Sequence, residues 1–122
     1  MNKNIEFLKE CKVFWLNTVS NNVPKSRPFG AISYDGMYIY IATSNQKNVY
    51  NEMILNPNVM ITAIKHNTRT WIRISGQVTL ETDIDKKLLL FNDNPILYER
   101  YDSLLDPKLA VFRLNIEEVT LN

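Results

Sequence analysis

Short runs of apolar residues, separated by polar turns, follow one another along most of the chain. Runs that are rich in β-branched and aromatic residues are typical of strands. They predict strands at residues 13–19, 25–34, 37–43, 59–64, 71–81 and 109–114, and a weaker alternation extends to 117–121. Helical spacing of apolar residues predicts helices at residues 3–10, 46–55 and 84–91, and a helical turn at 96–101.

The predicted helices each have an apolar face and a plausible start. In the first, Ile5, Phe7 and Leu8 are expected to face inward. In the second, Ser44 and Asn45 are expected to cap the N-terminus, and the inward stripe is expected to be Val49, Met53 and Ile54. Because the strands are short and are joined mainly by tight turns, the order does not suit repeated βαβ units. The pattern predicts an antiparallel barrel, mainly β, with peripheral helices.

The length of 122 residues suits one domain, residues 1–122. The formal net charge of +1 gives no basic surface that would indicate nucleic-acid binding or attraction to an anionic membrane. No run approaches the roughly 20 apolar residues of a membrane helix. The single cysteine, Cys11, cannot form an intramolecular disulfide, so we expect the protein to be located in the reducing cytoplasm.

Common catalytic motifs are missing from the chain. It has no Gly-x-Gly-x-x-Gly, no phosphate loop with Gly-Lys-Ser/Thr and no Gly-x-Ser-x-Gly. The one histidine, His66, has no second histidine or cysteine beside it, so we expect no metal site. We interpret His66 as a solvated turn residue and Cys11 as a buried or half-buried thiol.

The segment Arg27-Pro28-Phe29-Gly30 interrupts a predicted strand. Pro28 removes a backbone donor and favours an extended conformation at Arg27, which indicates a strand edge or a break in the ladder. Gly30 leaves room for close approach to the backbone. An extended arginine at an open edge could receive a planar anionic ligand; the equally acceptable alternative is a surface arginine at a bulge.

The segment from Thr43 to Lys47 runs from a strand end into a helix N-terminus. Free backbone N–H groups and the helix dipole attract phosphate there, and the hydroxyls of Thr43 and Ser44 add donors. Lys47 lies where the dipole disfavours a cation, which a bound anion would explain. The alternative is an ordinary cap followed by a solvated lysine.

The two segments together indicate a binding site more specifically than either segment does alone. Asp35-Gly36 is a tight-turn signal that would join residues 25–34 to residues 37–43 in a hairpin. Such a hairpin would place Arg27 opposite Ser44 and close to Lys47. The sequence therefore predicts a phosphate site formed by one hairpin and the helix that follows it.

The order of these motifs resembles a known family. Arg-Pro-Phe-Gly, then Ala-Thr-Ser-x-x-Lys-x-Val-Tyr, Asn-Pro and Trp-Ile-Arg-Ile-Ser-Gly are similar to the FMN-binding split barrels related to pyridoxamine 5′-phosphate oxidase. The chain looks closest to short members grouped with nitroimidazole-reductase-like proteins. The resemblance extends over about residues 7–121.

The resemblance implies a six-stranded antiparallel split β-barrel and a homodimer with FMN at the subunit interface. Pro28, Phe29 and Gly30 would lie along the flavin ring. Arg27, Thr43, Ser44 and Lys47 would hold the ribityl chain and phosphate, with Asn48 as a further phosphate ligand. Trp71 occupies the place where pyridoxamine-phosphate oxidases carry a polar residue that contacts the ring, and its indole would pack at the flavin edge across the dimer. The alternative for Trp71 is packing without flavin contact.

The expected function follows from the same resemblance. The protein would be an FMN-dependent oxidoreductase that takes electrons from a donor such as NADH or NADPH and passes them to a small planar substrate. The chain ends without the Trp- and Arg-containing segment that grips the B6 vitamer in pyridoxamine-phosphate oxidases, so B6 oxidation is not expected. The alternatives are a non-catalytic protein that stores or senses FMN or binds a heme-like cofactor, and a dimeric scaffold without cofactor. No catalytic side chain is assigned, and Tyr34, Tyr98 and Tyr101 are candidates for shaping the open face.

Overall fold

The structure, a computed structural model, describes residues 2–122, and Met1, the first residue of the predicted domain, lies outside them. Its elements, in chain order, are α1 (Asn2–Cys11), β1 (Phe14–Ser20), β2 (Val23–Phe29), β3 (Ser33–Tyr34), β4 (Tyr38–Ser44), α2 (Asn48–Leu55), β5 (Asn58–Ile64), β6 (Trp71–Glu81), α3 (Ile84–Asp93), α4 (Leu97–Arg100) and β7 (Leu109–Leu121). Among these residues no helix has the length and apolar character needed to cross a membrane.

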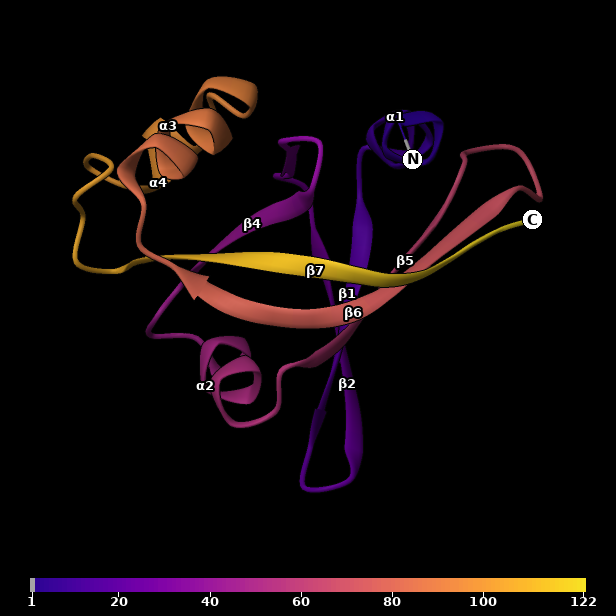
Figure 1. Ribbon diagram of the computed structural model, residues 1–122, viewed down its shortest axis with the longest axis horizontal. Coiled ribbons are helices and arrows are strands. Elements are labelled where there is room, and N and C mark those ends of the chain that lie inside the picture. Colours follow the sequence, from indigo (N-terminus) through magenta and orange to yellow (C-terminus); the bar gives the residue numbers. More distant parts are fainter. Residues whose placement is uncertain (1) are drawn as a thin grey trace.

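The strands form one antiparallel sheet in the order β2-β1-β5-β6-β7-β4-β3. The long strands β6 and β7 run side by side across the molecule, and the helices lie around the sheet (Figure 1). The predicted class, mainly β with peripheral helices, is confirmed. The strand count differs from the predicted six, because the two residues of β3 form a strand of their own. The weak alternation predicted at 117–121 is the end of a single strand, β7.

The core has two parts on opposite faces of β4. Ile39 and Ile41 face the main cluster inside the curved sheet, to which α1 contributes Ile5 and Leu8 and α2 contributes Val49 and Met53. Tyr40 faces the second cluster, which packs against α3 and α4. β4 is buried on both faces, which explains its continuous apolar sequence. Ile54, predicted to be buried on α2, is instead 49% exposed.

The chain between β1 and β4 does not follow the predicted hairpin. Asn21 and Asn22 both have positive φ, as a two-residue hairpin turn requires, and they join β1 to β2 in register Ser20↔Val23. β2 therefore pairs with β1, not with β4. At the Asp35-Gly36 turn only β3 pairs with β4, in register Tyr34↔Ile39. The prediction that one strand spans residues 25–34, with Arg27 opposite Ser44, was wrong.

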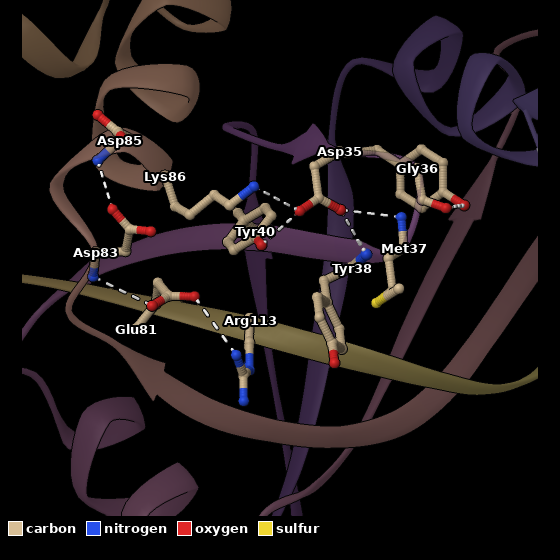
Figure 2. Close-up of polar contacts among 11 residues, drawn as sticks. Asp35, Gly36, Met37, Tyr38, Tyr40, Glu81, Asp83, Asp85, Lys86 and Arg113 are labelled. Carbon is tan, nitrogen blue, oxygen red and sulfur yellow. Dashed lines mark hydrogen bonds and ion pairs between the residues drawn. The ribbon is translucent and has the colours of Figure 1, made fainter.

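The carboxylate of Asp35 holds the turn between β3 and β4 against α3. It accepts hydrogen bonds from the backbone N–H groups of Met37 and Tyr38, from the Tyr40 hydroxyl and from Lys86 on α3 (Figure 2). Burial alone would raise the pKa of Asp35, but these bonds outweigh it and hold that pKa well below its ordinary value. The turn is thus attached to the helix layer through one charged group.

Gly76 marks a register shift between β6 and β7. A Cβ atom at this position would lie 2.0 Å from the carbonyl oxygen of Asn115, so only glycine permits this approach of the two backbones. An irregularity of this kind bends strands and increases their twist.

Candidate functional site

A cleft of about 760 Å³ opens where β2 ends, beside the N-terminus of α2 and the end of α4. This volume lies in the range of small-molecule and cofactor sites. The cleft is lined by Val13, Lys25, Ser26, Arg27, Pro28, Phe29, Gly30, Ala31, Ala42, Thr43, Lys47, Asn48, Val49, Glu52, Leu97, Arg100 and Tyr101.

The break in the second predicted strand creates one wall of this cleft. β2 ends at Phe29, and the chain turns inward through Gly30 and the buried Ala31 before β3 begins. A Cβ atom at Gly30 would have only an ordinary contact, 3.7 Å from the Lys12 carbonyl oxygen, so the fold does not require glycine there. Together with Ala42, these small residues leave an open wall on which a flat group can lie.

The guanidinium of Arg27 is held by the protein itself. Arg27 lies opposite Leu16 on β1, and its Nη1 donates to the Leu16 carbonyl oxygen at 3.2 Å and to the Thr18 hydroxyl at 2.8 Å. Its Nη2 pairs with Oε1 of Glu52 on α2 at 2.5 Å. The Arg27 side chain is 22% exposed, so part of it still faces the cleft, although its charge is shared with Glu52.

The start of α2 differs from the sequence prediction. The helix begins at Asn48, with Lys47 at the N-cap, and not at Ser44 or Asn45. Ser44 accepts a hydrogen bond from the N–H of Gln46 in the preceding turn, so its hydroxyl serves that turn. In the first helical turn, the N–H of Tyr50 donates to the Lys47 carbonyl oxygen at 3.1 Å. The N–H groups of Asn48 and Val49, two residues that line the cleft, have no backbone partner within residues 2–122.

Seven of the nine residues predicted to bind the cofactor line this cleft: Arg27, Pro28, Phe29, Gly30, Thr43, Lys47 and Asn48. They meet because β2 and β4 end at the same side of the molecule, not because they are paired in a hairpin. Ser44 and Trp71 do not line it. Trp71 is half-buried at the start of β6, where it pairs with Ile64 on β5. Its backbone N–H and carbonyl oxygen form hydrogen bonds with the backbone of Asn122.

The histidine and the cysteine both lie away from the cleft. His66 is exposed in the turn between β5 and β6, as predicted. Cys11 is half-buried at the end of α1, and burial raises the pKa of its thiol, so it remains protonated at neutral pH. Neither residue lines the cleft.

Sequence reasoning missed Glu52 of the cleft and Leu97 and Arg100 from α4. Glu52 shares the inward face of α2 with Val49 and Met53, so a charged residue within an apolar stripe was the available signal. Arg100 had no such signal, because the segment before β7 has no motif.

Tyr101 is the one of the three candidate tyrosines that lines the cleft. Burial raises the pKa of its phenol, whereas the charge of Arg100 acts to lower it. The phenol therefore stays protonated at neutral pH and can donate a hydrogen bond. The hydroxyl of Tyr34 is bonded to the Gly36 carbonyl oxygen, and Tyr98 is 50% exposed outside the cleft.

The charges of the cleft suit an anionic ligand. Lys25, Arg27, Lys47 and Arg100 are basic, and Glu52 is the acidic residue among the lining side chains. Close to them lie the small-residue wall and the apolar side chain of Leu97. A ligand with a phosphate, a polar chain and a flat ring fits this combination of donors and surfaces.

The fold and the cleft define a class: an antiparallel split barrel with a cofactor-sized cleft at the strand ends. The sequence profile described as pyridoxamine 5′-phosphate oxidase matches residues 2–122, and the chain belongs to this family.

Solved structures agree with the family. A NimC/NimA family protein from Clostridium acetobutylicum is 36% identical, with a TM-score of 0.90 over 100% of this chain and 86% of that one. An FAD-binding protein from Mesorhizobium loti (20% identity, TM-score 0.71, 98% and 91% coverage) shares the fold. So does a heme binding protein from Mycobacterium smegmatis (10% identity, TM-score 0.79, 95% and 50% coverage). No curated protein matches the sequence.

Proposed function

We propose that this protein binds FMN in the cleft and acts as an FMN-dependent oxidoreductase on a small planar substrate. The observation that carries the proposal is the meeting of Lys47, Arg27 and the α2 N-terminus with the open wall at Gly30. Membership of the pyridoxamine 5′-phosphate oxidase family supports it, as does the fold shared with an FAD-binding protein.

The residues of the cleft divide by chemistry. Lys47 and the first N–H groups of α2 would hold the phosphate, and Arg27 would add the part of its charge that faces the cleft. The backbone from Pro28 to Ala31 would lie along the ring, where backbone donors and acceptors match its polar edge. A bound flavin supplies hydride or electron transfer between a reduced nicotinamide and the substrate.

The protein groups around the ring supply orientation and hydrogen bonds. The protonated phenol of Tyr101 can donate to an oxygen of the substrate, and Leu97 excludes water beside it. No lining side chain is a histidine or cysteine. We therefore assign no general acid or base.

We propose further that the protein works as a homodimer in the reducing cytoplasm. Trp15 and Ile64 are 47% and 58% exposed on the outer face of β1 and β5, and Ile64 lies beside the half-buried Trp71. Exposed aromatic and aliphatic side chains grouped in this way favour an interface. In a dimer, Trp71 of one protomer would lie at the flavin edge of its partner.

A second candidate function is non-catalytic cofactor binding, with the flavin or a heme-like group held for storage or sensing. The fold shared with a heme binding protein favours it. A heme would need an axial ligand, and Tyr101 is the lining residue of a type that can ligate its iron.

The two candidates predict different spectra and reactions. Purified protein that carries FMN should be yellow, absorb near 370 and 450 nm, as flavins do to a rough approximation, and release FMN identified by mass spectrometry. Under anaerobic conditions, NADH or NADPH should bleach the flavin and a planar acceptor should restore its colour. A flavin that neither nicotinamide reduces would favour the binding protein. Colourless protein that ignores added FMN would contradict both flavin functions.

A further inference from the structure

Glu52 is an acidic residue in a cleft that otherwise attracts anions. It lies on the inward face of α2 between Val49 and Met53, and its side chain is only 12% exposed. That exposed part belongs to the lining of the cleft. A carboxylate placed beside a phosphate site weakens phosphate binding by repulsion, so its presence there calls for another role.

The two carboxylate oxygens of Glu52 have different surroundings. Oε1 accepts from the Thr18 hydroxyl at 2.6 Å and from Nη2 of Arg27 at 2.5 Å. Within residues 2–122, no group donates a hydrogen bond to Oε2. No buried side-chain oxygen or nitrogen of these residues lacks a partner, so Oε2 is accessible, and it belongs to a residue that lines the cleft.

An ionised carboxylate oxygen accepts hydrogen bonds and donates none, so Oε2 can bind only a donor group of the ligand. Thr18 and Arg27 fix the carboxylate so that this oxygen is held in place before a ligand arrives. A phosphate dianion presents no such donor, and neither do the apolar faces of a flat ring. Hydroxyl groups on the chain between them do.

We infer that Glu52 accepts a hydrogen bond from a hydroxyl of a polyol chain, so that the cleft selects a flat ring joined to a hydroxylated, phosphorylated chain. This inference rests on the proposed function and deepens it by assigning the ribityl chain to a particular side chain. A carboxylate bound to sugar hydroxyls is a familiar arrangement in nucleotide-binding proteins.

Three flavins separate this role from that of holding Arg27. FMN carries phosphate and hydroxyls, riboflavin lacks the phosphate, and lumiflavin lacks both. Their affinities for the apoprotein would be measured by fluorescence titration for wild type, Glu52→Gln and Glu52→Met. Glu10→Gln, a charge-matched variant of an exposed residue that pairs with Lys65, serves as control.

We expect Glu52→Met to lower the affinity for riboflavin about tenfold or more, which is the usual effect of losing a hydrogen bond to a charged group. Glu52→Gln should lower the affinity for riboflavin less than Glu52→Met does, and Glu10→Gln should leave this affinity unchanged. Lumiflavin affinity should stay within about twofold in every variant, which also shows that the variants keep a folded cleft. This pattern would support the inference.

Two other patterns would overturn it. If the variants lower only the affinity for FMN and leave the affinity for riboflavin unchanged, Glu52 acts through Arg27 on the phosphate and does not bind the hydroxyls. If the affinities for riboflavin and lumiflavin fall equally, the substitution acts on the shape of the cleft. Wild-type protein that binds none of the three flavins would overturn the proposed function as well, so the two failures are distinct.

Discussion

At the scale of single residues, the cleft balances charges that the sequence alone does not reveal. Arg27 donates one hydrogen bond to Glu52 and two others to Leu16 and Thr18. Lys47, in contrast, has no ion pair among the residues described and stands at the start of α2. An incoming phosphate therefore finds a fully available charge at Lys47 and a shared one at Arg27.

This difference predicts the effect of removing Lys47. Lys47→Ala should lower FMN affinity by roughly 1.5–3 kcal/mol, the usual contribution of a hydrogen bond to a charged group. Riboflavin, which has no phosphate, should bind Lys47→Ala as it binds wild type. The exposed Lys3 on α1 provides the control, because Lys3→Ala changes the net charge equally. Fluorescence titration checks the prediction, and equal losses for FMN and riboflavin would contradict a phosphate contact.

The residues that could be predicted are those with a motif around them. Pro28 and Gly30 marked the interruption of a strand, and Lys47 marked a helix start, and all three line the cleft. Glu52 could be found only as a charge within an apolar stripe. Arg100 has no local signal, because its position in the cleft depends on how α4 packs against the second core cluster.

At the scale of elements, local turn chemistry decided which strands pair. Two turns competed for the strand around Arg27: Asn21-Asn22 before it and Asp35-Gly36 after it. The residues at Asn21 and Asn22 adopt the left-handed conformations of a two-residue hairpin, so β2 pairs with β1 over all its seven residues. The second turn closes only the short β3–β4 pair. The Asp35-Gly36 signal predicted the second turn but not the length of the pairing that it closes.

The attachment of the β3–β4 turn to α3 predicts a pH-dependent stability. Since the pKa of Asp35 is lower in the folded protein, its ionised form stabilises the fold above the unfolded value of about 4. That contribution is lost as the pH falls from there through the folded pKa. Asp35→Asn should lower the free energy of unfolding by about 1–3 kcal/mol at pH 7.

Urea unfolding of both proteins at pH 7, 4 and 2.5 tests this prediction. The difference between wild type and Asp35→Asn should be largest at pH 7 and shrink as the pH falls below 4. Asp85→Asn, an exposed carboxylate in the first turn of α3, is the control and should show a smaller difference at pH 7. A difference between Asp35→Asn and wild type that stays constant across the three pH values would mean that the charge of Asp35 is not what holds the turn.

At the scale of the whole molecule, the period of the apolar pattern was enough to predict the class of fold. Residues 71–81 were expected as one strand, and β6 has those bounds, because its alternation is long and uninterrupted. The continuity of β7 could not be predicted in the same way. Its register with β6 shifts at Gly76, and its outer half alternates weakly, so the pattern around Glu117 indicated a separate strand.

The outer face of the sheet predicts the assembly of two protomers and its effect on the cofactor. Ile64→Asp would place a charge in the apolar group formed with Trp15 and Trp71, once in each protomer of a symmetric pair. A charged side chain introduced there should weaken association by about a hundredfold or more, or roughly 3 kcal/mol. In sedimentation at micromolar concentration, wild type should be a dimer and Ile64→Asp a monomer. Leu105→Asp, at a residue 79% exposed, should remain a dimer. In the proposed dimer the partner's Trp71 lies at the flavin edge, so FMN affinity should fall in Ile64→Asp and stay unchanged in Leu105→Asp. A monomeric wild type would contradict both expectations.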